Sequence, residues 1–124
     1  ETYVYKHFPK VKKLNILNIF AIRATDVKEV NKLLRENGKD YITGPDNDKW
    51  FEKTIKNSDH IICAWGNNNG IKPIVYDERI CLVKNMLKTS GKPFYAIFLK
   101  ETQKQPLHGL MWSFNYKLKD YSIQ

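Results

Sequence analysis

Polar side chains suited to binding and proton transfer lie within and directly after an apolar run near the start of the chain. Asn18 lies within the run Leu14–Phe20, and Arg23, Thr25 and Asp26 follow it. An arginine can hold a phosphate through two parallel hydrogen bonds, and an aspartate can act as a general base. Ligands of α/β sheets bind where strands end and helices begin, so we expect a binding site here.

Each of these side chains also has a structural explanation. Asn18 either hydrogen-bonds neighbouring loops or faces a ligand, because an unpaired buried amide costs about 1–3 kcal/mol. Arg23 either clamps a phosphate or pairs with Asp26 or Asp46. Asp26 suits the cap of a helix that begins at Val27, and a general base is its second role.

The end of a second predicted strand adds an aromatic ring and flexible backbone. Trp65 either stacks on a base or belongs to the core. The loop Gly66–Gly70 contains Asn67 and precedes a helix opened by Pro73, so its amides can cradle a phosphate. It lacks the Lys-Ser/Thr ending of a P-loop, and an ordinary loop is the alternative.

A third loop carries the histidine best suited to acid–base or electrostatic work. His108 lies between Pro106 and Gly109 in the loop that follows the last predicted strand. Asp48 is the second carboxylate that can orient water beside such a histidine, with Asn47 as a neighbouring ligand-binding residue. Both also fit the start of a helix.

Helices and strands alternate along the elements that must position these groups. Helices are expected at Thr2–Phe8, at Val27–Glu36, after Gly44-Pro45-Asp46 and at Pro73–Lys88. The residues expected to point inward are Trp50, Phe51 and Ile55 on the third helix and Tyr76, Ile80, Val83 and Leu87 on the fourth. Strands are expected at Leu14–Phe20, His60–Trp65 and Phe94–Leu99, and Leu110–Tyr116 is either a short strand or an aromatic extension. Such alternation predicts parallel pairing. The expected fold is one α/β domain over residues 1–124, a three-layer sandwich with a mainly parallel central sheet and helices on both faces.

Four short segments resemble, in order, the bacterial and phage family catalogued as domain of unknown function 1643. They are Asn18–Asp26, Gly44–Asp48, Ala64–Gly66 and Pro106–His108. The resemblance places Asn47 and Asp48 on the same edge as the other site residues, and the family's layout is distantly similar to that of uracil-DNA glycosylases. The resemblance implies an N-terminal strand before the first helix, which we expect to be absent from residues 1–124, and Gly109 stands where the family has a proline after His108.

The charge balance favours polyanionic partners. Lysine and arginine total 21 against 13 acidic residues, a formal charge of +8, which attracts nucleic acid or nucleotides. The alternative explanation for the excess of lysines is an AT-rich genome, which would scatter them without selection for binding. The one dense cluster of basic residues lies between Lys6 and Lys13. Apolar runs are too short to span a bilayer, so a cytoplasmic protein without membrane contact is expected. Cys63 and Cys81 suit reduced core thiols, and neither a metal nor a cofactor is indicated.

Three functions fit these residues. The first is cleavage of an N-glycosidic bond, the second is non-catalytic binding of a nucleotide or nucleic acid, and the third is a protein interaction module. In the first, Asn18 and Trp65 hold the base, and Arg23 or the Gly66–Gly70 loop holds the phosphate. His108 then stabilises a developing anion, and Asp26 or Asp48 orients water. In the third, the partner docks on Trp112, Phe114, Tyr116 and Tyr121. The sequence favours a nucleotide-directed pocket and leaves catalysis open.

Overall fold

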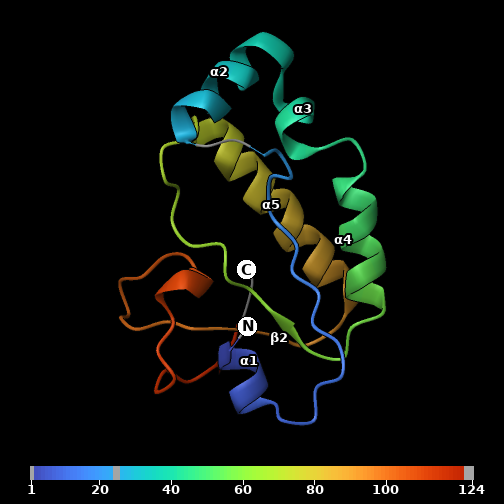
Figure 1. Ribbon diagram of the computed structural model, residues 1–124, viewed down its shortest axis with the longest axis vertical. Helices are drawn as coiled ribbons and strands as arrows, with labels where there is room; N and C mark the ends of the chain where they lie inside the picture. The colour runs from blue at the N-terminus through green and yellow to red at the C-terminus, as the bar shows by residue number, and fades with distance from the viewer. Residues whose placement is uncertain (1, 24–25, 122–124) are drawn as a thin grey trace. The chain divides into compact units, whose positions relative to one another are not determined.

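The computed structural model (Figure 1) describes residues 2–23 and 26–121, apart from the side chain of Leu110. The chain forms two compact units. The described residues of unit 1 are 2–16, 60–67 and 93–121, and those of unit 2 are 17–23, 26–59 and 68–92. Thr25, one of the predicted ligand-binding residues, lies outside the described residues.

Unit 1 holds the sheet. Its elements are α1 (Thr2–His7), β1 (Ile61–Ile62), β2 (Phe94–Ala96), the 3₁₀ helix η1 (Gly109–Met111) and β3 (Lys119–Asp120). Strand β1 pairs in parallel with β2, with Ile61 opposite Phe94. Strand β3 pairs antiparallel with β2 on its other side, with Tyr95 opposite Asp120.

The predicted three-layer sandwich with a mainly parallel central sheet is wrong. Helices dominate the described residues, and their sheet has three short strands of mixed direction in the order β1-β2-β3. The predicted strands His60–Trp65 and Phe94–Leu99 contain β1 and β2, but only two and three of their residues are paired. Residues 110–116 form no strand, and the third strand comes later, at β3.

Buried apolar side chains hold unit 1 together. Tyr3 and Val4 of α1 are buried, as are Cys63 after β1 and Ala96 at the end of β2. Tyr121 contacts the rings of Trp65, Phe94 and Phe98, with ring centroids 5.4 to 6.2 Å apart. This aromatic cluster fixes the strand ends on which the candidate site is built.

Unit 2 is helical. It contains α2 (Val27–Asn37), α3 (Lys39–Thr43), α4 (Asn47–Lys56) and α5 (Pro73–Ser90). Helices α4 and α5 lie side by side (Figure 1). The predicted helices after Asp26 and at Pro73 are confirmed, and α3 was not predicted.

The inward faces of α4 and α5 were predicted correctly except at Trp50. Phe51 and Ile55 are buried from α4, and Tyr76, Ile80, Val83 and Leu87 are buried from α5. Trp50 is 56% exposed, because successive helical residues lie about 100° apart and Phe51 already faces inward. Lys92 donates from its ammonium to the carbonyls of Ile55 and Ser58 at 2.8 and 2.9 Å, which satisfies the end of α4.

The predicted strand Leu14–Phe20 is wrong, since no strand is present among these residues. Two of its carbonyls, those of Asn18 and Ile19, accept from side chains and not from a neighbouring strand. The carbonyl of Ile19 accepts from the side chains of Asn47 and Arg79. Further along, the amide of Ala21 donates to the carbonyl of Thr43 at 3.1 Å. Carbonyls that are already paired with side chains are not available to a neighbouring strand.

Three further features concern membrane spans, metal ligands and thiols. Within the described part of the chain, no helix is both long and apolar enough to cross a membrane, and no group of three or more His, Cys, Asp or Glu is placed to hold a metal ion. Cys63 is a buried thiol as predicted, whereas Cys81 is exposed and not part of the core.

Candidate functional site

In unit 1, the carboxyl ends of β1 and β2 bring together two segments far apart in sequence. The amide of Gly66 donates to the carbonyl of Pro106 at 3.0 Å, and the amide of Leu107 donates to that of Ile97 at 3.0 Å. The segment after β1 therefore lies alongside the loop after β2. This follows from the parallel pairing of the two strands, because both carboxyl ends then lie at one edge.

Gly66 and His108 make the closest contact at this edge. Gly66 is buried and has φ +73°, a conformation that glycine adopts without strain. A Cβ at this position would lie 2.8 Å from the Cβ of His108. Only glycine allows the two backbones to approach this closely, and the exposed His108 side chain is placed by that approach.

Trp65 is tied into the same edge. Its Nε1 donates to Oε1 of Gln105 at 2.8 Å, and its ring centroid lies 6.2 Å from that of Tyr121. The ring is half-buried, so it contributes to the unit's packing while keeping some accessible surface. Asn67, the next predicted ligand-binding residue, is exposed beyond Gly66.

The loop after β2 is held by its own amide side chains. Gln103 donates from Nε2 to the carbonyls of Ile97 and Gln105 at 2.9 and 2.7 Å, and its Oε1 accepts from the amide of Leu99 at 3.0 Å. Gln103 and Gln105 were not predicted from the sequence, because a glutamine in a polar loop gives no signal of its partners. Their bonds make this loop a fixed platform for His108.

Tyr121 gives unit 1 a testable alkaline sensitivity. Burial, followed by the nearby Cys63, raises the pKa of Tyr121 to about 12, above its ordinary value of about 10. The folded state thus keeps a proton that the unfolded chain loses. The resulting stability is fully present below about pH 10 and is lost as pH rises toward about 12.

We expect Tyr121→Phe to flatten the fall in stability between about pH 10 and about pH 12. Chemical denaturation followed by circular dichroism at a series of pH values measures it. Tyr41→Phe is the control, because Tyr41 is 52% exposed. An unchanged pH profile for the Tyr121 variant would contradict the prediction.

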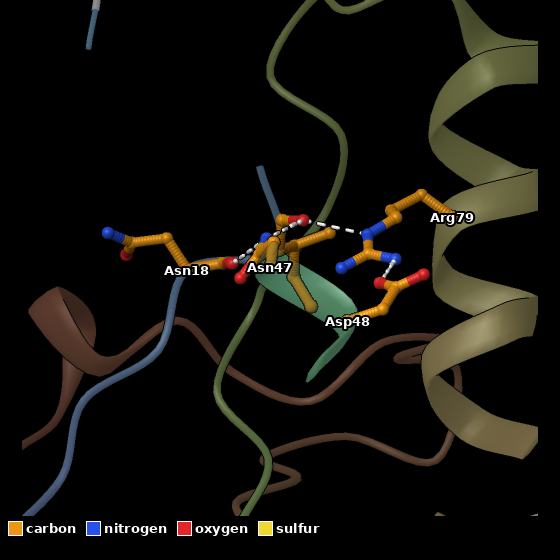
Figure 2. Close-up of polar contacts among 5 residues, drawn as sticks. Asn18, Asn47, Asp48 and Arg79 are labelled. Carbon is orange, nitrogen blue, oxygen red and sulfur yellow. Dashed lines mark hydrogen bonds and ion pairs between the residues drawn. The ribbon is translucent and has the colours of Figure 1, made fainter. Parts of the chain in front are cut away.

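In unit 2, Asn47 holds the start of the first family-like segment (Figure 2). Its Nδ2 donates to the carbonyls of Asn18 and Ile19 at 3.1 and 3.2 Å. Asn47 is buried, whereas Asn18 is exposed with its side chain directed away from Asn47. The polar partner of this segment is therefore Asn47, and the amide of Asn18 takes no part in these bonds.

Arg79 of helix α5 binds the same segment. Asn47, Asp48 and Arg79 are together called the clamp below. Its Nε donates to the carbonyl of Ile19 at 2.8 Å, and Nη1 pairs with Asp48 (Figure 2). The Arg79 side chain is 5% exposed and that of Asp48 is 48% exposed. Within the described part of the chain, Nη2 of Arg79 is buried and has no hydrogen-bond partner.

A sequence signal for Arg79 existed and was missed. Arg79 lies three residues after Tyr76 and four before Val83, on the face of α5 that is otherwise apolar. A buried charged residue on such a face needs an oppositely charged or hydrogen-bonding partner. In unit 2, that partner is Asp48, one of the predicted catalytic residues.

The two family-like segments of unit 2 thus pack on each other. Gly44 has φ +96°, and a Cβ there would lie 2.9 Å from that of Ala21. Gly44 and Asn47 of the second segment contact the first directly, and Asp48 is linked to it through Arg79. The other two segments, Ala64–Gly66 and Pro106–His108, pack together in unit 1 in the same way.

Asp26 caps helix α2, as predicted. Its Oδ1 accepts from the amide of Glu29 at 2.9 Å, and its own backbone is extended. Arg23 is exposed, and in unit 2 no ion pair joins it to Asp26 or Asp46. The structural pairing weighed for Arg23 is therefore absent from the described residues.

We expect Asp26→Ala to destabilise the protein by about 1 kcal/mol, because the amide of Glu29 loses its acceptor. Asp26→Ser is the matched control: serine caps a helix almost as well but carries no carboxylate. Thermal unfolding measures both variants. Equal losses for alanine and serine would show that the cap is not the source of the effect.

Asn68, two residues after Gly66, binds the backbone of its own loop. Asn68 accepts at Oδ1 from the amides of Gly70 and Ile71 at 3.1 and 2.9 Å. Asn31 of α2 donates to the carbonyl of Gly70 at 2.9 Å. These bonds favour the ordinary-loop explanation for residues 68–71.

The predicted site residues divide between the two units. Trp65, Gly66, Asn67 and His108 belong to unit 1, and Asn18, Arg23, Asp26, Asn47 and Asp48 belong to unit 2. In unit 1 they gather at a strand edge. In unit 2, Asp26 and Asn47 bind backbone groups and Asp48 pairs with Arg79.

Comparison with known proteins identified one family. The profile of the family described as protein of unknown function (DUF1643) matches residues 5–110. Neither the curated proteins nor the solved structures gave a match.

Proposed function

Because the chain belongs to the DUF1643 family of proteins of unknown function, we propose its function from its own residues: it binds a nucleotide or nucleic acid at the carboxyl edge of β1 and β2. The observation that supports this most is the close approach of Gly66 to His108 at that edge. Parallel strand ends are where α/β sheets bind ligands. This edge carries groups for each part of a nucleotide.

The chemistry of the edge suits a base and a phosphate. The half-buried ring of Trp65 offers a stacking surface, and Asn67 offers an exposed amide. His108 and the exposed Lys100 and Lys104 on the same loop supply positive or hydrogen-bonding groups for a phosphate. Together these groups favour an anionic ligand that carries an aromatic ring.

Binding without catalysis is the stronger form of the proposal. Cleavage of an N-glycosidic bond needs a carboxylate to orient water, and Asp26 or Asp48 was assigned that role. Asp26 is occupied as a helix cap and Asp48 as the partner of Arg79. Both carboxylates therefore have structural work, which favours a non-catalytic binder.

The protein interaction module is supported less well by the same reasoning. Nε1 of Trp112 donates to the carbonyl of Leu107 at 3.0 Å, and the carbonyl of Tyr116 accepts from Tyr3. Tyr121 packs in the aromatic cluster. The side chains of Trp112 and Tyr121 are thus used within unit 1, and Tyr116 is held by its backbone.

Isothermal titration calorimetry with mononucleotides of all four bases tests the proposal. We expect saturable binding that weakens several-fold in His108→Ala, the loss of about 1 kcal/mol typical of a hydrogen bond. His60→Ala is the control, because it removes an exposed imidazole elsewhere in unit 1. Equal affinity of the wild type and His108→Ala, or no binding at all, would overturn the proposal.

The same samples separate a binder from an enzyme. Chromatography after prolonged incubation with nucleosides, nucleotides and DNA should recover intact ligand. Release of free base by the wild type, with its loss in His108→Ala, would establish the enzyme instead. A general acid or oxyanion donor typically contributes about 10²-fold or more to rate.

A further inference from the structure

We propose that a second surface of unit 1 binds single-stranded nucleic acid along its phosphate backbone. This N-terminal lysine surface comprises Lys6, Lys10, Lys12, Lys13 and Lys117, with the rings of Tyr5 and Phe114. It extends the proposed function from a nucleotide at the strand edge to a polymer, through other residues. The inference rests on the proposed function in one respect, which is that both expect a ligand made of nucleotides.

Contacts between the two ends of unit 1 build this surface. Nε2 of His7 donates to the carbonyl of Phe114 at 2.8 Å, and the hydroxyl of Tyr3 donates to the carbonyl of Tyr116. The rings of Tyr3 and His7 stack with centroids 4.1 Å apart. Helix α1 is thereby fixed against residues 114–116, which are followed directly by Lys117.

The side chains of Lys6 and Phe114 meet at this junction. Nζ of Lys6 lies 4.4 Å from the centroid of the Phe114 ring. Phe114 and Tyr5 remain 45% and 51% exposed. A cation beside an exposed ring, as Lys6 lies beside Phe114, is a combination that binds phosphates and stacks unpaired bases. Tyr5 adds a second exposed ring on α1.

Lysines far outnumber acidic residues in unit 1. Its lysines are Lys6, Lys10, Lys12, Lys13, Lys100, Lys104, Lys117 and Lys119, all exposed or on exposed segments. Its acidic residues among those described are Glu101 and Asp120. Residues 2–16 contain no carboxylate side chain, so nothing within that segment neutralises its lysines.

The structure favours a single strand over a duplex or a membrane. A duplex hides the faces of its bases, which would leave Tyr5 and Phe114 without partners. Insertion into a membrane needs a helix with a free apolar face. The apolar residues Tyr3 and Val4 of α1 are buried in the protein, so that face is not available.

Fluorescence anisotropy with a labelled thymidine oligonucleotide tests the inference on the whole chain. We expect Lys10→Gln, Lys12→Gln and Lys13→Gln combined to weaken binding about tenfold or more at low salt. The slope of log affinity against log salt should fall by about 2, since each phosphate contact on a single strand contributes about 0.7. Tyr5→Ala and Phe114→Ala should each weaken binding about fivefold or more.

A variant with the same loss of charge provides the control. Lys28→Gln, Lys32→Gln and Lys88→Gln combined remove three exposed lysines from unit 2. Equal weakening by both triple variants would reduce the effect to overall charge and overturn the inference. Equal affinity for duplex DNA, or binding to anionic vesicles and not to the oligonucleotide, would also overturn it. Circular dichroism confirms that each variant is folded.

The two proposals fail separately. Mononucleotide binding that depends on His108 tests the strand edge, and the lysine variants should leave it unchanged. Oligonucleotide binding that depends on Lys10, Lys12 and Lys13 tests the N-terminal lysine surface. If mononucleotides do not bind while the oligonucleotide does, the proposed function is wrong and this inference stands.

Discussion

Asp48→Ala is expected to destabilise the protein by about 2–4 kcal/mol, because it leaves the guanidinium of Arg79 buried without its charged partner. Arg79 is 5% exposed and already has one buried nitrogen, Nη2, without a partner in the described residues. Asp48 itself is 48% exposed, so solvent screens part of the pair and places the loss below that of a fully buried one. Chemical denaturation measures the effect.

Two further variants identify the cause of that loss. Arg79→Met should cost less, about 1–2 kcal/mol, because the remaining carboxylate of Asp48 can be hydrated while methionine fills the space. In the Arg79→Met variant, adding Asp48→Ala should then lower the free energy of unfolding only a little further. Asp46→Ala is the control for charge at the start of α4, since Asp46 makes only a 3.9 Å ion pair with Lys49. A loss for Asp48→Ala no larger than for Asp46→Ala would refute the clamp.

Gly66→Ala is expected to destabilise the protein by about 3 kcal/mol or more, for two independent reasons. An alanine at φ +73° is strained by about 1–2 kcal/mol. Its Cβ would also lie 2.8 Å from the Cβ of His108, and backbone shifts in a packed region cost typically about 1–3 kcal/mol. Thermal or chemical unfolding measures the total.

Gly91→Ala separates the two causes. Gly91 has φ +69° at the end of α5, but a Cβ there would meet nothing within 4 Å. Gly91→Ala should therefore lower the stability only through backbone strain, by about 1–2 kcal/mol. Gly66→Ala should also weaken nucleotide binding, because His108 must move, whereas Gly91→Ala should not. Equal losses of stability at the two glycines would contradict the close approach at the strand edge.

The helices of this protein were largely predictable because their signals are local. Asp26 starts α2 through a bond to Glu29, and Pro73 and Gly91 bracket α5. Each of these signals acts within one turn of helix. The apolar spacing of Tyr76, Ile80, Val83 and Leu87 likewise gave the buried face of α5 correctly.

The sheet was predicted less well because strands need distant partners. The apolar run Leu14–Phe20 is typical of a buried strand, yet its carbonyls pair with the side chains of Asn47 and Arg79. Strand β3 consists of Lys119 and Asp120, which carry no apolar alternation and are paired only because Tyr95 and Ala96 lie beside them. No local pattern distinguishes these outcomes.

The candidate site shows the same division. The sequence by itself determined the polar groups near strand ends, the cap at Asp26 and the excess of lysine, because composition and local spacing suffice for these. Only the tertiary structure decided that Asp48 is the partner of Arg79, that Gly66 approaches His108, and that Lys6 lies over Phe114. Such contacts join residues more than thirty positions apart, and their geometry is set by the packing of whole elements, which local spacing does not encode.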